Sequence, residues 1–473
     1  MRLPGIHTQR LKPVVLALSA VLLSGCATFS SDGGLDTVSS LTKERTGQSV
    51  LQAKTDADTT AIDKTLNELL GKPLTPDGAV QVALLNNKGF QSSLAELGIA
   101  EADLVQAGRM RNPSFSFSRL REGHDVEIER SIMFDLVGLL TIPLRTNIES
   151  RRFEQAKLQA AVQAVRLAAD TRKAYFNAVA AQQTVQYMDQ VLTAAEAGAE
   201  LAKRMARVGN WSKLDQAREQ AFYADAVAQA ARARHNAAAA REQLTRLLGL
   251  WGNRTAYQLP ERLPDLPKAP KDVSDIEAQA MQQRLDVQMA KRDAETTAAA
   301  LGLSKATGFI NVLHAGYANK SETDAPRANG YEIELELPIF DWGRSRTAKA
   351  EAIYMQSVHR TADAAIRARS EVREVYSAYR TSYDLAKHYR DEIVPLRKKI
   401  SDEMLLRYNG MLASVFELLA DARIQVNSVN AAIEAQRDYW IADTDLQMAI
   451  NGSGGASAPM RGGAAPADAG GGH

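Results

Sequence analysis

The stretch Leu335-Glu336-Leu337-Pro338-Ile339 decides the fold, because a similar stretch stands 195 positions earlier as Leu140-Thr141-Ile142-Pro143-Leu144. In the later copy, apolar side chains alternate with glutamates up to the proline, which is the pattern of an amphipathic strand. A proline has no backbone N–H to donate to a sheet, so each stretch predicts the exit of a strand. The recurrence indicates a chain built from two copies of one unit.

Two other pairs of stretches show the same duplication. Ala83–Gln91 matches Ala280–Gln288 at an offset of 197. A turn pattern recurs at an offset of 202, with Gly209 matching Met411, Ser212 matching Ser414 and Asp215 matching Glu417. Each copy is predicted to contain a helix, a β-hairpin, a very long helix, a turn and a long return helix. Helices longer than a globular core requires indicate an elongated and oligomeric assembly.

The predicted fold class is mainly α with a small β part, and the chain divides into six segments. They are a lipoprotein signal peptide (1–25), an extended N-terminal segment with one short helix near 62–70 (26–72), the first repeat (73–258), a Pro-rich linker (259–273), the second repeat (274–451) and a disordered Gly/Ala-rich tail (452–473). The hairpins are placed at about 113–143 and 309–338, and the tip turns at about 207–215 and 408–417.

The first repeat has clear local signals. Thr75 and Pro76 predict the start of a helix that runs to Met110. Alternating apolar and polar residues on both sides of a turn at 121–125 predict the hairpin. From 147 to 208 the only helix breaker is Gly198, so one long helix is predicted there.

The second repeat follows the same plan. Ser274-Asp275-Ile276-Glu277 resembles a capping box that starts its first helix. Strands are predicted at 310–318 and 331–337, around a turn at 319–330. The long helix from Asp341 to Tyr408 contains Pro395, which is predicted to kink it.

The N-terminus has the pattern of an export signal. A basic start precedes the apolar run Val14–Leu23, which is too short to span a bilayer as a helix. Leu23-Ser24-Gly25-Cys26 resembles a bacterial lipobox, so a covalent lipid is expected on Cys26. Ala27 in place of Asp favours the outer membrane. The alternative is a chance cysteine after an uncleaved signal.

Composition and motifs argue against other classes of protein. The net charge of +1, from 57 basic and 56 acidic residues, argues against a nucleic-acid partner. The seven histidines form no pair at metal-ligand spacing, so no metal site is expected. No phosphate-binding loop or nucleophile elbow is present, so we expect no catalytic residues and no cofactor beyond the lipid.

The ordered landmarks resemble the TolC-like outer-membrane efflux protein family, in its outer-membrane factor lipoprotein form. The residues that carry the resemblance, within about 70–451, are Ala83-Leu84, Asn112-Pro113, Arg284-Leu285-Asp286, Leu337–Arg344, and Arg407-Tyr408 ahead of Ser414 and Glu417. The chain departs from the family pattern in two places. Arg145-Thr146-Asn147 replaces a Phe-Asp-x-Gly pattern, and the second turn has its glycine at Gly410, one place before Met411.

The resemblance implies a homotrimer in the outer membrane of a Gram-negative bacterium, lipid-anchored and mostly periplasmic. Four strands from each chain would close a 12-stranded β-barrel, continued by a periplasmic α-helical barrel. The implied partners are a periplasmic adaptor (membrane fusion) protein, an inner-membrane transporter and outer-membrane lipid. The sequence agrees in one respect, since four short strands in one chain cannot close a barrel or hide their edges.

The resemblance also assigns a periplasmic tip and gate. Its residues are Gly209, Ser212, Asp215, Tyr408, Gly410, Ser414 and Glu417. Glu417 matches a pore-facing acid, and three copies would form a carboxylate ring that attracts cations. The alternative is that Glu417 only caps a helix. Asp215 and Tyr408 match positions that tie neighbouring helices together, or else they are two exposed polar residues. Ala413 and Ala420 replace charged residues of the family, so the gate is expected to be more weakly locked.

The predicted barrel strands carry a row of acids. Glu127, Glu129, Glu332, Glu334 and Glu336 share their polar faces and would line the lumen. The alternative is the solvated face of an ordinary hairpin. Arg130 falls on the apolar face, where it could snorkel to the interface.

The sequence therefore predicts a non-enzymatic exit duct of a tripartite efflux system, which passively conducts small molecules or ions. Two alternatives stay open: a structural periplasmic coiled-coil lipoprotein that acts as a scaffold or tether, and a duct dedicated to metal cations. The alternating hairpins favour a duct, because a scaffold needs no lipid-facing strands.

Overall fold

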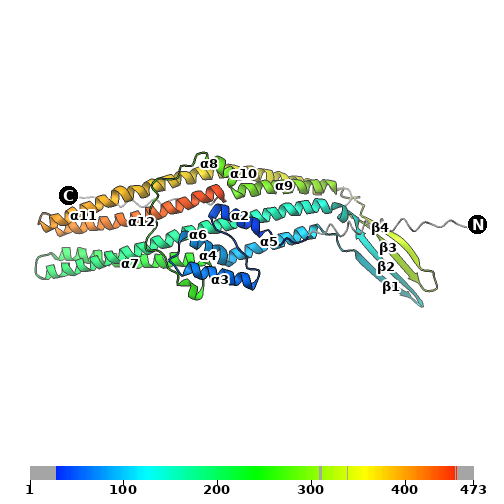
Figure 1. Cartoon of the computed structure of the whole chain (residues 1–473), viewed down its shortest axis with the longest axis horizontal. Helices are drawn as coiled ribbons and strands as arrows, with labels where there is room; N and C mark the ends of the chain where they lie inside the picture. Colours follow the sequence, from blue (N-terminus) through cyan, green and yellow to red (C-terminus); the bar gives the residue numbers. More distant parts are fainter. Residues whose placement is uncertain (1–27, 308–311, 338, 453, 455–473) are drawn as a thin grey trace, which may run out of the picture. The chain divides into compact units, whose positions relative to one another are not determined.

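The computed structural model describes residues 28–307, 312–337, 339–452 and 454, and it is mainly helical with one small sheet (Figure 1). The described elements of the N-terminal segment and first repeat are α2 (Leu35–Thr46), α3 (Asp56–Leu70), α4 (Pro76–Asn86), α5 (Lys88–Ala107), β1 (Ser114–Glu122), β2 (Asp125–Asp135), α6 (Leu136–Arg207) and α7 (Lys213–Leu248). After the short η1 (Gly252–Thr255), those of the second repeat are α8 (Ile276–Gln283), α9 (Leu285–Ala306), β3 (Leu313–Glu322), β4 (Ala328–Leu335), α10 (Arg344–His388), the π-turn η2 (Tyr389–Ile393), α11 (Val394–Asn409) and α12 (Val415–Asn451). Among these helices, none combines the length and the apolar character needed to cross a bilayer.

The predicted signal peptide with Cys26, the tail from 455 onward, and Pro338 lie outside the described residues. The described chain divides into two compact units. The first combines the segments 28–63, 84–165 and 285–365, and the second combines 64–83, 166–284 and 366–454. Each unit therefore contains parts of both repeats.

The four strands of the first unit form one antiparallel sheet in the order β1-β2-β3-β4 (Figure 1). Both predicted hairpins form, with turns at 123–124 and 323–327. The turn predicted at 319–330 is too long, because 319–322 belong to β3 and 328–330 to β4. The two hairpins pair through β2 and β3, from Glu127 opposite Glu322 to Asp135 opposite His314. One strand of each repeat thus joins the copies into a single sheet.

The predicted strand exit at Pro143 is wrong, because β2 ends at Asp135 and α6 starts at once. The Asp135 carboxylate accepts a hydrogen bond from the Gly138 backbone N–H (2.6 Å), which supplies the cap that starts the helix. Pro143 then lies inside α6. The second repeat differs, since β4 ends at Leu335 and α10 begins only at Arg344.

The helix predicted from Pro76 to Met110 is two helices. The Asn87 side chain accepts from the Phe90 N–H (3.0 Å) and so caps α5, which ends α4 one residue earlier. Arg284 interrupts α8 and α9 at the matching position, 197 residues later. The duplication is therefore preserved in the helix breaks as well as in the hairpins.

Three other local expectations have clear outcomes. The helix predicted to kink at Pro395 is interrupted close to it, because the π-turn η2 ends two residues before this proline. The short helix expected near 62–70 is confirmed by α3 (Asp56–Leu70). The expectation that the rest of the N-terminal segment is extended is wrong, since α2 also forms there. The capping box at Ser274 is also wrong: Asp275 is the N-cap in a left-handed conformation (φ 57°), with no side-chain capping bond.

Aromatic residues form much of the core of the second unit. The rings of Tyr379 and Tyr383 lie 5.7 and 5.6 Å from the ring of Tyr439, between α10 and α12. The Pro-rich linker packs against these helices, because the Trp440 indole donates to the Pro264 carbonyl (3.0 Å). The linker is therefore an ordered strap of this unit.

Candidate functional site: the sheet and the helix turns

The pairing register separates the sheet into two chemically different faces. Directly opposed residues in an antiparallel ladder share a face. On β2 and β4, one face carries Glu127, Glu129, Glu332 and Glu334, as the sequence predicted. Glu336 lies one residue beyond the end of β4. The sheet thus brings acids from both repeats to one side.

A cation that the sequence analysis missed lies among these acids. The Lys320 Nζ lies 2.5 Å from a Glu127 oxygen, 2.7 Å from a Glu322 oxygen and 3.8 Å from a Glu129 oxygen. His314 approaches Glu334 at 3.0 Å. Lys320 and Glu322 stand two residues apart on β3, so period-two alternation could have placed Lys320 on the acidic face. The polar face is therefore acidic but partly neutralised.

The opposite face is apolar and exposed to solvent in the single chain. Its members across the four strands include Phe115, Phe117, Ile132, Phe134, Tyr317, Tyr331 and Ile333. Phe115 is 66 % exposed and Tyr331 is 92 % exposed. An apolar face of this size marks an interaction surface with protein or lipid.

Arg130 lies on this apolar face, as the alternation predicted. Its guanidinium donates to the Asn319 side-chain oxygen (3.2 Å) and lies 6.0 Å from the centre of the Phe117 ring. Its neighbours on the sheet therefore supply both a hydrogen-bond acceptor and an aromatic face for the charge.

The two tip turns have matching backbone geometry. In the first, Gly209 is left-handed (φ 79°) and the Asn210 N–H donates to the Met205 carbonyl (3.0 Å). In the second, the Leu412 N–H donates to the Arg407 carbonyl (2.8 Å) and the left-handed residue is Met411 (φ 60°). Gly410 lies in the turn but outside its left-handed position, because its φ is −83°. A methionine occupies the position that glycine holds in the first copy.

Serine caps the return helix after both turns. The Ser212 hydroxyl accepts from the Asp215 N–H (3.1 Å), and the Ser414 hydroxyl accepts from the Glu417 N–H (3.2 Å). The Glu417 carboxylate returns a bond by accepting from the Ser414 N–H (2.7 Å), so the capping box is complete. This backbone bond, with the Ser414 hydroxyl, lowers the pKa of Glu417.

The capping role of Glu417 is confirmed, and its place in a pore-facing ring stays a prediction. Asp215 accepts from the Ser212 hydroxyl (2.6 Å) and approaches Arg218 at 3.7 Å. Within the described residues these are local contacts, and none joins Asp215 to the half-buried Tyr408. The lock between them therefore stays a prediction about contacts between helices of an assembly.

An ion pair between a buried glutamate and a partly exposed arginine, which sequence reasoning missed, joins α7 to α12. The Arg423 guanidinium donates to a Glu219 oxygen at 3.3 Å and lies 4.4 Å from the centre of the Phe222 ring. Glu219 is 2 % exposed, and this burial raises the pKa of its carboxyl. Its partner stands 204 residues away in the chain, so no local pattern could reveal the pair. It connects the two return helices of the duplicated unit.

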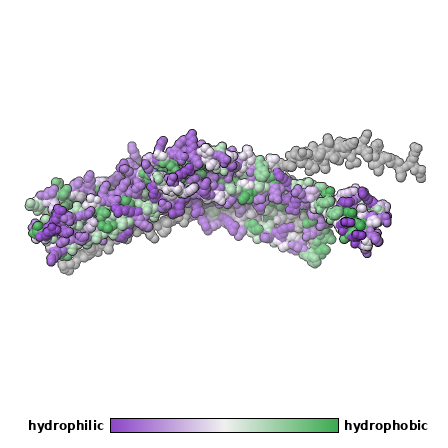
Figure 2. Space-filling view, turned by 90° about the horizontal axis from the view of Figure 1, so that it is seen from below, coloured by the Kyte–Doolittle hydropathy of each residue, from purple (hydrophilic) through white to green (hydrophobic). Residues whose placement is uncertain are grey.

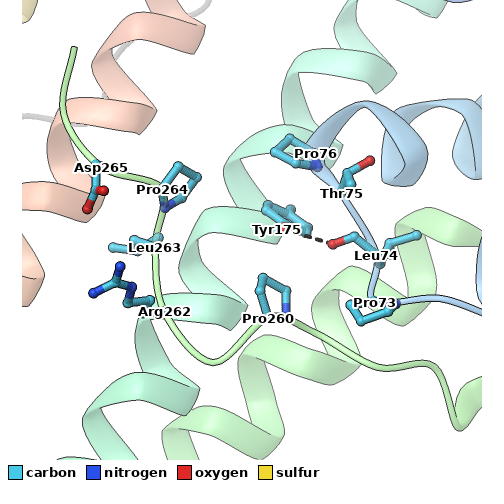
Figure 3. Close-up of a pocket in the computed structure, with 10 residues that line it drawn as sticks. All are labelled: Pro73, Leu74, Thr75, Pro76, Tyr175, Pro260, Arg262, Leu263, Pro264 and Asp265. Atoms are coloured by element: carbon cyan, nitrogen blue, oxygen red, sulfur yellow. Dashed lines mark hydrogen bonds between the residues drawn. The ribbon is translucent and has the colours of Figure 1, made fainter.

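A pocket of about 390 Å³ lies where the start of α4 and the Pro-rich linker meet α6 (Figure 3). Pro76, Pro260 and Pro264 surround the Tyr175 ring, and the Tyr175 hydroxyl donates to the Leu74 carbonyl (2.9 Å). Thr75 is engaged as the cap of α4 through the Gly78 N–H (3.0 Å). The pocket is a packing junction of prolines around one buried tyrosine.

The comparisons with known proteins agree with this geometry. No family model and no curated protein matches the chain. A solved membrane protein from Pseudomonas aeruginosa superposes with a TM-score of 0.68 at 19 % identity, covering 82 % of this chain and 94 % of that one. The CmeC outer membrane channel of Campylobacter jejuni gives 0.65 at 16 %, covering 82 % and 85 %. The MtrE outer membrane channel of Neisseria gonorrhoeae, in an open state, gives 0.66 at 17 %, covering 79 % and 88 %.

This chain has the TolC-like fold of outer-membrane channels. The similarity extends over about four-fifths of this chain and over 85 to 94 % of each of these solved chains. The amphipathic sheet and the two turns are the candidate functional surfaces of this chain. Within the described residues, no group of three or more His, Cys, Asp or Glu side chains could hold a metal ion.

Proposed function

We propose that this chain is an outer-membrane exit duct, which passively conducts small molecules or ions from the periplasm to the exterior as a homotrimer. The observation that carries the proposal is the two-faced sheet. One face is apolar and exposed, which suits contact with acyl chains, and the other is lined with carboxylates, which suits a water-filled lumen.

The edges of the sheet support the proposed trimer. β1 and β4 each have one unpaired edge in the described sheet, and unpaired backbone groups are very costly in a bilayer. Pairing β4 of one chain with β1 of the next removes all edges once the ring closes. Three chains of four strands would form a 12-stranded barrel, a size within the range of outer-membrane barrels.

The turns are the proposed docking end for a periplasmic adaptor fed by an inner-membrane transporter. Both turns present exposed apolar side chains: Val208, Leu214, Met411 and Leu412. Exposed apolar groups at the end of a long helical pair are suited to contact with another helical protein. Opening would separate α7 from α12 or turn the helix pairs apart, and a lipid on Cys26 would hold the N-terminus in the membrane.

The carboxylates of the polar face favour cations in general. Lys320 neutralises part of that charge, so the face is not a dedicated chain of metal ligands. The scaffold alternative leaves the apolar face without a role, whereas the duct accounts for both faces.

Cysteine labelling tests the orientation of the sheet, because neighbouring residues face opposite ways. Ser116→Cys lies on the polar face and Phe117→Cys on the apolar face, and Gly123→Cys in the turn serves as the accessible control. In proteoliposomes, a membrane-impermeant maleimide should label the variants at 116 and 123 but not at 117. Equal labelling at 116 and 117 would contradict a lipid-facing apolar side.

A further inference from the structure

One end of the sheet collects apolar and basic residues together. β1 and β3 begin, and β2 and β4 finish, at this same end, because Ser114 lies opposite Met133 and Leu313 lies opposite Leu335. The chain segments that leave this end carry exposed apolar side chains, including Leu140, Phe340 and Trp342. Phe340 is 100 % exposed. Figure 2 shows hydrophobic residues gathered where the helices meet the strands.

Arginines flank these apolar segments. Arg109 and Arg111 precede β1, Arg145 follows β2, and Arg344 and Arg346 follow β4. These arginines and the apolar segments all belong to the first compact unit. A basic zone next to an exposed apolar zone matches the order of groups in a phospholipid, with a phosphate next to acyl chains.

The arginines that precede β1 and follow β2 border an open cleft of about 890 Å³ between the end of α5, the first turns of α6 and the end of α9. Its charged lining consists of four arginines and two acids: Arg109, Arg111, Arg145, Arg152, Asp103 and Glu149. With Asp135, which lies 3.4 Å from Arg111, counted as a third acid, one positive charge remains in excess and favours an anion.

The existing contacts leave hydrogen-bond donors for a ligand. Arg152 is paired with Glu149 (2.7 Å), and the exposed Arg111 lies 3.4 Å from Asp135. Arg145 donates from one terminal nitrogen to the Gly138 carbonyl (2.7 Å). A guanidinium has five N–H donors, so this bond leaves others available. Among the described residues, Arg109 makes no ion pair.

We propose that this arginine cleft binds the phosphate of an anionic phospholipid in the periplasmic leaflet, with the acyl chains lying along the exposed apolar segments beside it. The inference rests on the proposed function, because it requires the sheet to lie in a bilayer. A guanidinium can donate two parallel hydrogen bonds to two oxygens of one phosphate, so arginines favour a phosphodiester group as the ligand. The apolar segments select a lipid over a free anion.

Trp342 supplies a reporter two residues before Arg344. A variant with Trp211, Trp251 and Trp440 replaced by phenylalanine is reconstituted in phosphatidylcholine vesicles that contain one-fifth phosphatidylglycerol. The fluorescence of Trp342 is quenched by brominated acyl chains. The bromine is placed either on the phosphatidylglycerol or on an equal fraction of the phosphatidylcholine. Enrichment of the anionic lipid should make the labelled phosphatidylglycerol the stronger quencher. Each arginine near a membrane surface favours an anionic lipid by roughly five-fold.

In Arg109→Ala/Arg145→Ala, the preference for phosphatidylglycerol should fall several-fold, while quenching by labelled phosphatidylcholine stays unchanged. Arg327→Ala, in the turn at the opposite end of the strands, is the matched control and should keep the preference. Equal preference in the double variant and the parent would overturn the proposal. Inorganic phosphate that abolishes the preference at constant ionic strength would show a free-anion site instead. Absence of quenching by either lipid would contradict the proposed function itself, which separates the two failures.

Discussion

Removal of Arg423 should destabilise the helix pair formed by α7 and α12, because it leaves the Glu219 carboxylate buried without its cation. We consider Arg423→Met, which keeps the length of the side chain and its contact with Phe222 while removing the charge. Loss of one partner of a fully buried ion pair costs about 3–5 kcal/mol. Arg423 is 41 % exposed, so water screens part of the interaction and about 2 kcal/mol is the better expectation.

The effect should depend on pH, with a definite sign. Burial raises the pKa of Glu219 above its unfolded value, so the folded state binds a proton at a pH where the unfolded state does not. The ionised carboxylate is therefore a cost, which grows as pH rises from the unfolded pKa through the folded pKa. Without Arg423 the folded pKa should rise further. The deficit of the variant should thus be largest near pH 7.5 and should shrink toward pH 5.

Thermal unfolding followed by circular dichroism at both pH values is a direct assay. About 2 kcal/mol in a chain of this size should lower the Tm by roughly 2–5 °C at pH 7.5. Arg218→Met, which removes an exposed arginine next to Glu219 in the sequence, is the matched control and should leave the Tm nearly unchanged. Glu219→Gln/Arg423→Met should recover most of the loss, since no buried charge remains. A Tm for Arg423→Met equal to that of the parent at both pH values, or a deficit that grows toward pH 5, would refute the reasoning.

Three further predictions concern the turns and the sheet. Met411→Gly should stabilise the protein by about 1 kcal/mol, because a non-glycine residue is strained at φ 60°, and Gly209→Ala should destabilise it by a similar amount; Tm measurements test both. Glu417→Gln should lower stability at neutral pH through the loss of the charged cap. The difference in stability should vanish as pH falls through the lowered pKa of Glu417, because the parent then also becomes protonated. Thermal melts of both proteins at pH 7 and pH 3 test whether the difference closes. Lys320→Met should increase cation over anion selectivity, because Glu127 and Glu322 lose their counter-ion, and the reversal potential in a salt gradient measures this; an unchanged potential would place these carboxylates away from the conducting path.

Local patterns were sufficient for much of this fold. The strict alternation around Ile333 and Glu334 is imposed by the pleat of a strand, and the serine at each tip stands three residues before an acid because a helix start needs a cap. Pro395 interrupts its helix because it has no N–H and crowds the preceding turn. In each case the physical cause lies within a few residues of the effect.

The expectations that failed depended on competing local signals or on distant partners. The run from Leu136 to Leu144 can form a strand or a helix by composition, and the cap supplied by Asp135 decides for a helix. The match of Gly209 with Met411 did hold, because the bond from Leu412 to Arg407 reproduces the first turn and gives Met411 the left-handed position. The pairing of β2 with β3 brings Lys320 to Glu127, and no local pattern encodes such a contact.

The central claim is that three copies of this chain form a pore that is narrowest at the tip turns. Single-channel conductance of the purified full-length protein in a planar bilayer, beside Glu417→Ala, tests it most directly. We predict discrete cation-selective openings that become larger or more frequent in the variant, because three carboxylates leave the constriction. Silence from both proteins, with only monomers by mass, would contradict the account.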